Sequence, residues 1–193
     1  MAKDERKQIT DAIAKHRQML ADLQKDGIDI IIGAVEMIAD SLSNGGCVYI
    51  CGNGGSAADA QHIAGELVGR FAMERKGLAA VALSTDTSVL TSIANDYGYE
   101  KVFTRQVEAL VKEGDIFWAI STSGNSLNIV DAAKLARQYK AMVLAFTGKI
   151  NSELEKIADI CFCAEAKTSF RCQEIHQLAY HVICELVEQR CCE

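Results

Sequence analysis

The sequence contains no proline. Its turns must therefore be built from Gly, Asn, Asp and Ser, and its helices can run long. No apolar run approaches the ~20 residues that a membrane-spanning helix requires. The chain begins Met-Ala-Lys-Asp-Glu-Arg-Lys with no apolar stretch after it, so we expect neither a secretory signal nor a membrane association.

Positive charge is also scarce. The chain has 20 Lys and Arg against 26 Asp and Glu, which gives a formal net charge of −6. An acidic protein of this kind has little electrostatic attraction for nucleic acid or for an anionic membrane surface. We therefore expect no nucleic-acid partner, and any phosphate that binds must be held by local backbone amides.

The eight cysteines include no C-x-x-C pair, which disfavours a zinc knuckle or a thioredoxin-type centre. The pair at the end of the chain, Cys191 and Cys192, is expected to be exposed. Five further cysteines lie among apolar residues, and we expect them to be reduced thiols of the core. They are Cys47, Cys51, Cys161, Cys163 and Cys184. This usage predicts a protein of the reducing cytoplasm.

The length of 193 residues predicts one domain, residues 1–193. Residues 1–43 form an N-terminal helical pair, split near residues 25–27, because apolar side chains recur there at helical spacing. Residues 44–193 contain the sheet and a closing helix over residues 170–189. The predicted strands are 47–51, 78–83, 116–120, 142–147 and 160–163, and the predicted helices between them are 56–71, a segment from 88 towards 111, and 126–139. Apolar strands that alternate with helices indicate an α/β fold whose parallel sheet is covered on both faces.

Two loops follow predicted strands at the edge where such sheets bind ligands. The first, Gly52-Asn53-Gly54-Gly55-Ser56, can turn sharply and bring the amides of a helix start close to an anion. It matches neither G-x-G-x-x-G nor a P-loop, and an ordinary turn with Ser56 as the helix N-cap is the plain alternative. The second loop, residues 121–126, offers four hydroxyls, more than one helix cap requires. Together the two loops predict a small phosphate ester as ligand.

His62 and Glu66 stand four residues apart on the helix after the first loop, so they share a face. This spacing suits two metal ligands or a base with its partner, although it can also be a helix-stabilising contact. Gln173 and His181 lie roughly 12 Å apart along the last predicted helix. A single ion is hard to reach from both, which favours supply of one group by a neighbouring subunit. His176 is left outside the predicted site.

Asn95 and Asp96 follow an apolar helical stretch. They either end that helix or hydrogen-bond a polyhydroxylated ligand, and the sequence leaves both possibilities open.

Together these segments resemble the SIS (sugar isomerase) family, and within it the enzymes that isomerise sedoheptulose 7-phosphate. The resemblance spans nearly the whole chain. The segments that carry it are Cys51–Ser56, His62–Arg70, Ala94–Asp96, Ile120–Ser126 and Arg171–His176, with His181 beyond them.

The resemblance implies a three-layer α/β/α SIS fold, with a five-stranded parallel sheet flanked by helices and with N-terminal helices that serve oligomerisation. It also implies a cytoplasmic homotetramer with active sites at subunit interfaces and one Zn²⁺ per subunit. Glu66 and His181 match the acid–base pair of the family. The implied zinc ligands are His62, Glu66, Gln173 and His181. The implied substrate-binding residues are Asn53, Gly54, Gly55, Ser56, His62, Glu66, Asn95, Asp96, Ser121, Thr122, Ser123, Ser126 and Gln173.

The implied reaction is an aldose–ketose isomerisation of sedoheptulose 7-phosphate to D-glycero-D-manno-heptose 7-phosphate through an enediol, the first step of nucleotide-heptose biosynthesis for bacterial cell envelopes. The alternative is a non-catalytic SIS-domain binding protein of the replication-initiator-associating type, which lacks the acid–base residues. The presence of Glu66 and His181 favours the enzyme. A phosphosugar-sensing regulator is disfavoured because residues 1–43 contain no evident DNA-recognition helix.

Overall fold

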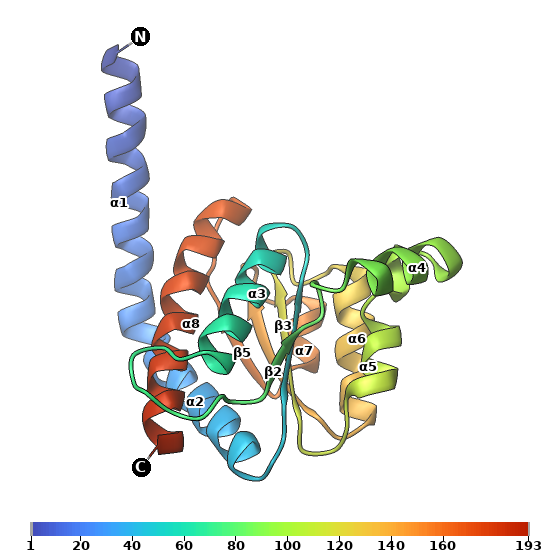
Figure 1. Cartoon of the computed structure of the whole chain (residues 1–193). Coiled ribbons are helices and arrows are strands. Elements are labelled where there is room, and N and C mark those ends of the chain that lie inside the picture. The colour runs from blue at the N-terminus through green and yellow to red at the C-terminus, as the bar shows by residue number, and fades with distance from the viewer. Residues whose placement is uncertain (1, 193) are drawn as a thin grey trace.

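A computed structural model describes residues 2–192 (Figure 1). Met1 and Glu193, the outer limits of the predicted domain, lie outside the described residues. Within this range one parallel sheet has the strand order β2-β1-β3-β4-β5. All the predicted strands are present, although β2 is shorter than expected. They are β1 (Val48–Gly52), β2 (Ala80–Ala82), β3 (Ile116–Ser121), β4 (Met142–Thr147) and β5 (Ile160–Cys163).

Most of the helices also agree with the prediction. They are α1 (Ala2–Asp26), α2 (Ile28–Ser43), α3 (Gly55–Val68), α6 (Leu127–Gln138) and α8 (Ser169–Cys192). The segment from 88 towards 111 differs, because the chain turns at Gly98, where φ is +90°. It consists of α4 (Thr87–Tyr97), the 3₁₀ turn η1 (Tyr99–Lys101) and α5 (Thr104–Leu110), and a further short helix, α7 (Glu153–Ile157), was not predicted.

The side chains of β3 show how the layers form. Ile116, Trp118 and Ile120 belong to an apolar cluster shared with α2, α3 and α8. Phe117 and Ala119, which point to the opposite face, belong to a cluster shared with α5, α6 and α7. Helices therefore cover both faces of the sheet, as Figure 1 shows. The predicted three-layer fold is confirmed.

Trp118, the single tryptophan, lies in the middle strand of the sheet and is fully buried. Its ring meets that of Phe146 on β4 edge to face, with 5.1 Å between ring centroids. The indole Nε1 is buried and has no hydrogen-bond partner among the described residues. This side chain thus serves as packing in the centre of the core.

Helix α1 extends well beyond the sheet and its covering helices (Figure 1). Near its C-terminal end, Leu20 and Leu23 pack against the core. Nearer the N-terminus, Ile9 and Ile13 are 61% and 57% exposed and share one face of the helix. None of the described helices is both long enough and apolar enough to cross a membrane.

All eight cysteines are free thiols. Burial raises the pKa of both Cys172 and Cys184 to about 12, so these thiols stay protonated. The expectation that Cys191 is exposed is wrong. It is half-buried because it packs against the apolar core, whereas Cys192 is exposed.

The sheet order places the two predicted loops side by side. The chain leaves β1 through α3 on one face of the sheet, and it leaves β3 through α6 on the other. Gly52 at the end of β1 pairs with Ile120 near the end of β3. The carboxyl ends of these neighbouring strands therefore flank the point where connections diverge to opposite faces, the usual ligand site of such sheets.

Candidate active site

The first loop leads directly into α3. Gly54 precedes the helix with φ +57° and ψ −121°, a conformation that suits glycine, and no side chain among residues 2–192 caps the helix. Ser56 lies inside the helix, so the alternative in which it is the N-cap is wrong. Its buried hydroxyl instead accepts a hydrogen bond from the Gln173 amide of α8, at 3.3 Å between Nε2 and Oγ.

Asn53 is held rigidly at the mouth of this loop. Its side-chain amide exchanges two hydrogen bonds of 3.0 Å with the amide of Asn128. The Tyr99 hydroxyl also donates to Asn53 Oδ1 at 3.0 Å. The prediction missed both partners. A signal for Asn128 is its position near the start of a helix whose neighbouring residues Ile129 and Val130 are apolar, where a buried amide requires a partner.

The second loop gathers its hydroxyls together. Ser121 Oγ lies 3.3 Å from Ser123 Oγ and 3.1 Å from Ser126 Oγ. Ser126 occupies the N-cap position of α6, yet within the described part of the chain its side chain makes no capping hydrogen bond. Helix capping thus does not account for Ser126, and the grouped hydroxyls can hydrogen-bond a phosphate.

A cavity of about 370 Å³ lies between the two loops and the start of α8. Most of the predicted substrate-binding residues in the loops line it, together with Ser169 and Phe170, which were not predicted. The lining residues are Asn53, Gly55, Ser56, Ile120, Ser121, Thr122, Ser126, Ile129, Ser169, Phe170 and Gln173. A second cavity, between the junction of α1 with α2 and strand β5, contains none of the predicted site residues.

Gly55 allows Gln173 to approach the helix start. A Cβ atom at Gly55 would lie 2.6 Å from Gln173 Nε2 and 2.9 Å from its Oε1. A side chain at position 55 would therefore displace the Gln173 amide from its place beside the start of α3. Gln173 is held at the first turn of α3, at the cavity.

Further along the same two helices, three predicted residues converge. His62 Nε2 lies 3.0 Å from Glu66 Oε1 and 3.4 Å from His181 Nε2. The potential ligand atoms of these residues all lie within 4.8 Å of one another. The Tyr180 hydroxyl contacts His62 Nδ1 at 3.0 Å and so orients that ring. Tyr180 was not predicted as part of the site.

This donor set suits a zinc ion. Tetrahedral zinc with bond lengths of about 2.0–2.1 Å to imidazole holds its ligand nitrogens about 3.3 Å apart. The 3.4 Å between the two Nε2 atoms of His62 and His181 agrees with this value. Gln173, the fourth predicted ligand, does not join the cluster in one chain, because its amide contacts Ser56, nearly two helical turns before His62.

The electrostatics of the cluster favour a neutral imidazole. Burial lowers the pKa of His181, as does the neighbouring His62, while Glu66 acts in the opposite direction. A neutral imidazole has one nitrogen that donates and one that accepts, so it can bind a metal or pass on a proton.

Asp59 is a further carboxylate on α3, one turn before His62. Burial raises its pKa to about 6, although His62 acts in the opposite direction. Its Oδ2 atom is buried without a hydrogen-bond partner among the described residues. The prediction did not include Asp59, although its spacing of three residues from His62 on a helix could have drawn attention to it.

Asn95 and Asp96 are not part of this cavity. They lie within α4, which continues to Tyr97 and is C-capped by Gly98, so the alternative in which they end the helix is wrong. Both are exposed, and Asn95 Nδ2 donates to Asp96 Oδ1 at 2.8 Å. Figure 1 shows α4 pointing away from the rest of the chain.

Comparisons with known proteins agree with this geometry. A family model described as SIS domain matches residues 13–148. A phosphoheptose isomerase from Thiobacillus denitrificans is 48% identical over 187 residues, which cover 93% of this chain and 95% of that protein. One from Helicobacter hepaticus is 51% identical over 160 residues, covering 83% of this chain and 82% of that protein. The structure of a phosphoheptose isomerase from Francisella tularensis has a TM-score of 0.92 at 33% identity, covering 96% of this chain and 98% of that one. This chain therefore belongs to the SIS-domain family and, within it, to the phosphoheptose isomerases.

Proposed function

We propose that this chain converts sedoheptulose 7-phosphate to D-glycero-D-manno-heptose 7-phosphate, the first step of nucleotide-heptose biosynthesis, in the cytoplasm. The observation that carries the proposal is the convergence of Glu66, His62 and His181 on the two helices whose first turns border the hydroxyl-lined cavity. The name shared by the two relatives described above, phosphoheptose isomerase, supports the same reaction.

The cavity between the two loops binds the phosphate end of the substrate in this proposal. Hydroxyls and backbone amides at the helix starts supply neutral donors, which suits an acidic protein. The proposed contacts are Asn53, Gly54, Gly55, Ser56, Ser121, Thr122, Ser123, Ser126 and Gln173.

Glu66 is the proposed base. It takes a proton from C1 of the ketose, which gives a cis-enediol, and the same proton is returned to C2. His181 moves a proton between the oxygens on C1 and C2, since a neutral imidazole can both accept and donate. Because Glu66 Oε1 contacts His62, the second carboxylate oxygen is the one we assign to proton abstraction.

His62, Glu66 and His181 would hold a zinc ion, with Gln173 as the proposed fourth ligand from a neighbouring subunit. When bound, zinc would polarise the substrate carbonyl and stabilise the negative charge that develops on its oxygen. A carboxylate that binds zinc through one oxygen is a weaker base. We therefore propose that one oxygen of Glu66 binds zinc and that the other accepts the proton.

Within one chain, Gln173 lies apart from the cluster of His62, Glu66 and His181, so completion of the site by a neighbouring chain is part of the proposal. We propose a homotetramer in which α1 and α2 contribute to the contacts. The exposed apolar face of α1 with Ile9 and Ile13 supports this role. Helix α4 carries the exposed residues Asn95 and Asp96 and points away from the rest of the chain (Figure 1), which supports their delivery to the active site of a neighbouring chain.

The test is incubation with sedoheptulose 7-phosphate, with and without a chelator, followed by detection of the aldose. The proposed function predicts aldose formation by the zinc-loaded protein. Binding of the sugar phosphate without any product, under both conditions, would instead indicate the non-catalytic SIS-domain binding protein.

A further inference from the structure

The connection between α3 and β2 is anchored by a buried ion pair. Arg75 Nε lies 2.8 Å from Glu188 Oε1, and the two side chains are 4% and 1% exposed. Withdrawing two charges from water is costly, and such a pair persists only when its other hydrogen-bonding groups are also satisfied. The partners of both residues therefore show what the pair holds in place.

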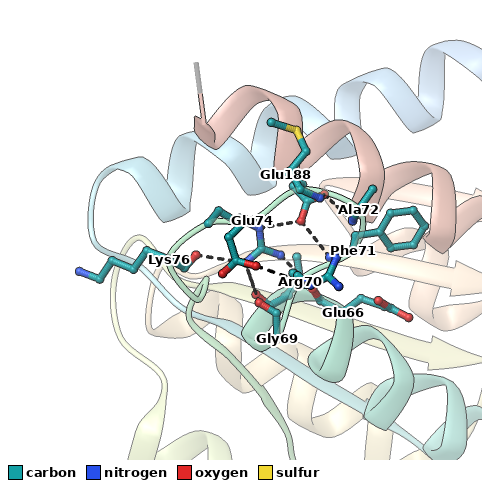
Figure 2. Close-up of polar contacts among 11 residues, drawn as sticks. Glu66, Gly69, Arg70, Phe71, Ala72, Glu74, Lys76 and Glu188 are labelled. Atoms are coloured by element: carbon teal, nitrogen blue, oxygen red, sulfur yellow. Dashed lines mark hydrogen bonds and ion pairs between the residues drawn. The ribbon is translucent and has the colours of Figure 1, made fainter.

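Glu188 binds the loop that follows α3. Its carboxylate accepts hydrogen bonds from three consecutive backbone N–H groups, those of Phe71 at 2.8 Å, Ala72 at 2.7 Å and Met73 at 2.8 Å. Figure 2 shows Glu188 facing Phe71 and Ala72. Burial alone would raise the pKa of Glu188, but these donors and Arg75 outweigh it and lower the pKa to about 2. The carboxylate is thus charged at neutral pH.

Arg75 reaches in the other direction, to the end of α3. Its guanidinium donates to the backbone oxygen of Glu66 at 2.9 Å and to that of Leu67 at 2.9 Å. It also donates to Gly69 O at 3.3 Å. Carbonyls in the last turn of a helix lack partners within the helix, and a positive charge there is favourable. Arg75 thus holds the turn of α3 that carries Glu66.

The same loop contacts His181. The ring of Phe71, whose N–H binds Glu188, lies 5.8 Å from the His181 ring between centroids. His181 precedes Glu188 by seven residues on α8, so both face α3 and its loop. The ion pair of Arg75 and Glu188 therefore holds both the helical turn that contains Glu66 and the aromatic ring of Phe71 beside His181.

We propose that Arg75 and Glu188 are positioning residues that hold Glu66 and His181 at the separation needed for proton transfer, without touching the substrate. This inference rests on the acid–base roles proposed for Glu66 and His181. The phosphate cavity lies at the opposite end of α3, at Gly55 and Ser56. Loss of the ion pair should therefore lower kcat and leave KM nearly unchanged.

The test compares Glu188→Gln with Val187→Ala, its buried neighbour on α8, by steady-state kinetics and thermal unfolding. Because a misplacement of about 1 Å can cost 10²-fold, we expect Glu188→Gln to lower kcat roughly 10- to 100-fold. We expect KM within about threefold of the wild-type value. Val187→Ala should lower the melting temperature but retain kcat. An unchanged kcat in folded Glu188→Gln, or an equal loss in Val187→Ala, would overturn the proposal.

A second variant and a second measurement keep the test independent of folding and of the reaction. Arg75→Lys retains the charge but not the fork of donors, and its kcat should lie between those of the wild type and Glu188→Gln. Hydrogen exchange should become faster at the amides of Phe71, Ala72 and Met73 in Glu188→Gln, and unchanged exchange there would also contradict the proposal. If the wild-type chain shows no isomerase activity, the proposed function fails. Hydrogen exchange still tests whether the ion pair of Arg75 and Glu188 holds the loop in place.

Discussion

The Nε2 atoms of His62 and His181 lie 3.4 Å apart although the two residues are 119 positions apart in the chain. Two imidazole nitrogens at this separation can bind one metal ion. Helices α3 and α8 pack against each other, and this contact turns two distant histidines into one site. The site is also partly open to solvent, because the His62 side chain is 42% exposed.

Glu66→Gln tests the proposed base. The substitution preserves the shape of the side chain but removes its ability to accept a proton, so kcat should fall by about 10²- to 10⁴-fold. Binding of the sugar phosphate, measured by calorimetry, should remain because the cavity residues are untouched. Gln61→Ala, an exposed position on the same helix, is the control and should leave kcat near the wild-type value. Wild-type turnover by Glu66→Gln would remove this role.

Zinc binding can be measured without the reaction. After chelation and dialysis, titration with Zn²⁺ should show one ion per chain, with a lower affinity in His62→Gln and in His181→Gln. His16→Gln serves as the matched control, because His16 contacts Glu174 and lies outside the cluster. Equal zinc affinity in all four proteins would show that the cluster is not the metal site.

Gly55→Ala should weaken substrate binding. Its Cβ would lie 2.6 Å from Gln173 Nε2, so the amide must move out of its place in the cavity wall. We expect KM to rise by about tenfold or more, equivalent to a loss of ~1.4 kcal/mol in binding. Gly65→Ala on the same helix is the comparison, because a Cβ there meets nothing within 4 Å. It should leave KM unchanged and stabilise the helix by roughly 0.5–1 kcal/mol.

We expect the buried His176 to lower the free energy of unfolding at acidic pH. Burial lowers its pKa to about 4, although a hydrogen bond to the Thr147 carbonyl acts in the opposite direction. Below pH 6.5 the His176 imidazole is protonated in the unfolded chain but remains neutral in the folded chain. The free energy of unfolding therefore falls as the pH decreases from 6.5 to 4. The fall is about 3 kcal/mol from this residue alone.

Urea unfolding of the metal-free protein at pH 7 and pH 4.5 provides the measurement. In His176→Gln the amide can still donate to Thr147, but the ionisable group is gone. The variant should therefore lose less stability than the wild type between the two pH values. Parallel losses in both proteins would mean that other groups determine the acid sensitivity.

The sequence was sufficient to predict the strands and the two ligand loops. Continuous apolar runs such as residues 116–120 have one interpretation in a sheet covered on both faces, and glycine or hydroxyl clusters directly after strands identify its ligand-binding edge. Helix α7 was missed because five residues are too few to show a helical period. The segment from 88 to 111 was merged for a related reason, since the break occurs at a single residue, Gly98.

The partners of the site residues were harder to predict than the site residues themselves. His62 and Glu66 are linked by a helical spacing that can be read locally. Tyr180 and Asn128 act through contacts between elements that are 118 and 75 residues apart, which no local pattern encodes. Glu188 resembles an ordinary charged residue of a terminal helix, and its burial follows only from the course of the loop after α3.

The packing of Trp118 has a practical consequence for unfolding studies. A lone indole in the middle strand gives an intrinsic fluorescence signal that comes from the sheet and not from the helices around it. Its emission should be blue-shifted in the native protein and should move to the red when β3 and β4 separate. Circular dichroism at 222 nm would meanwhile report all the helices together, including the 25 residues of α1. If the projecting helix frays before the core unfolds, part of the ellipticity should be lost before the fluorescence changes.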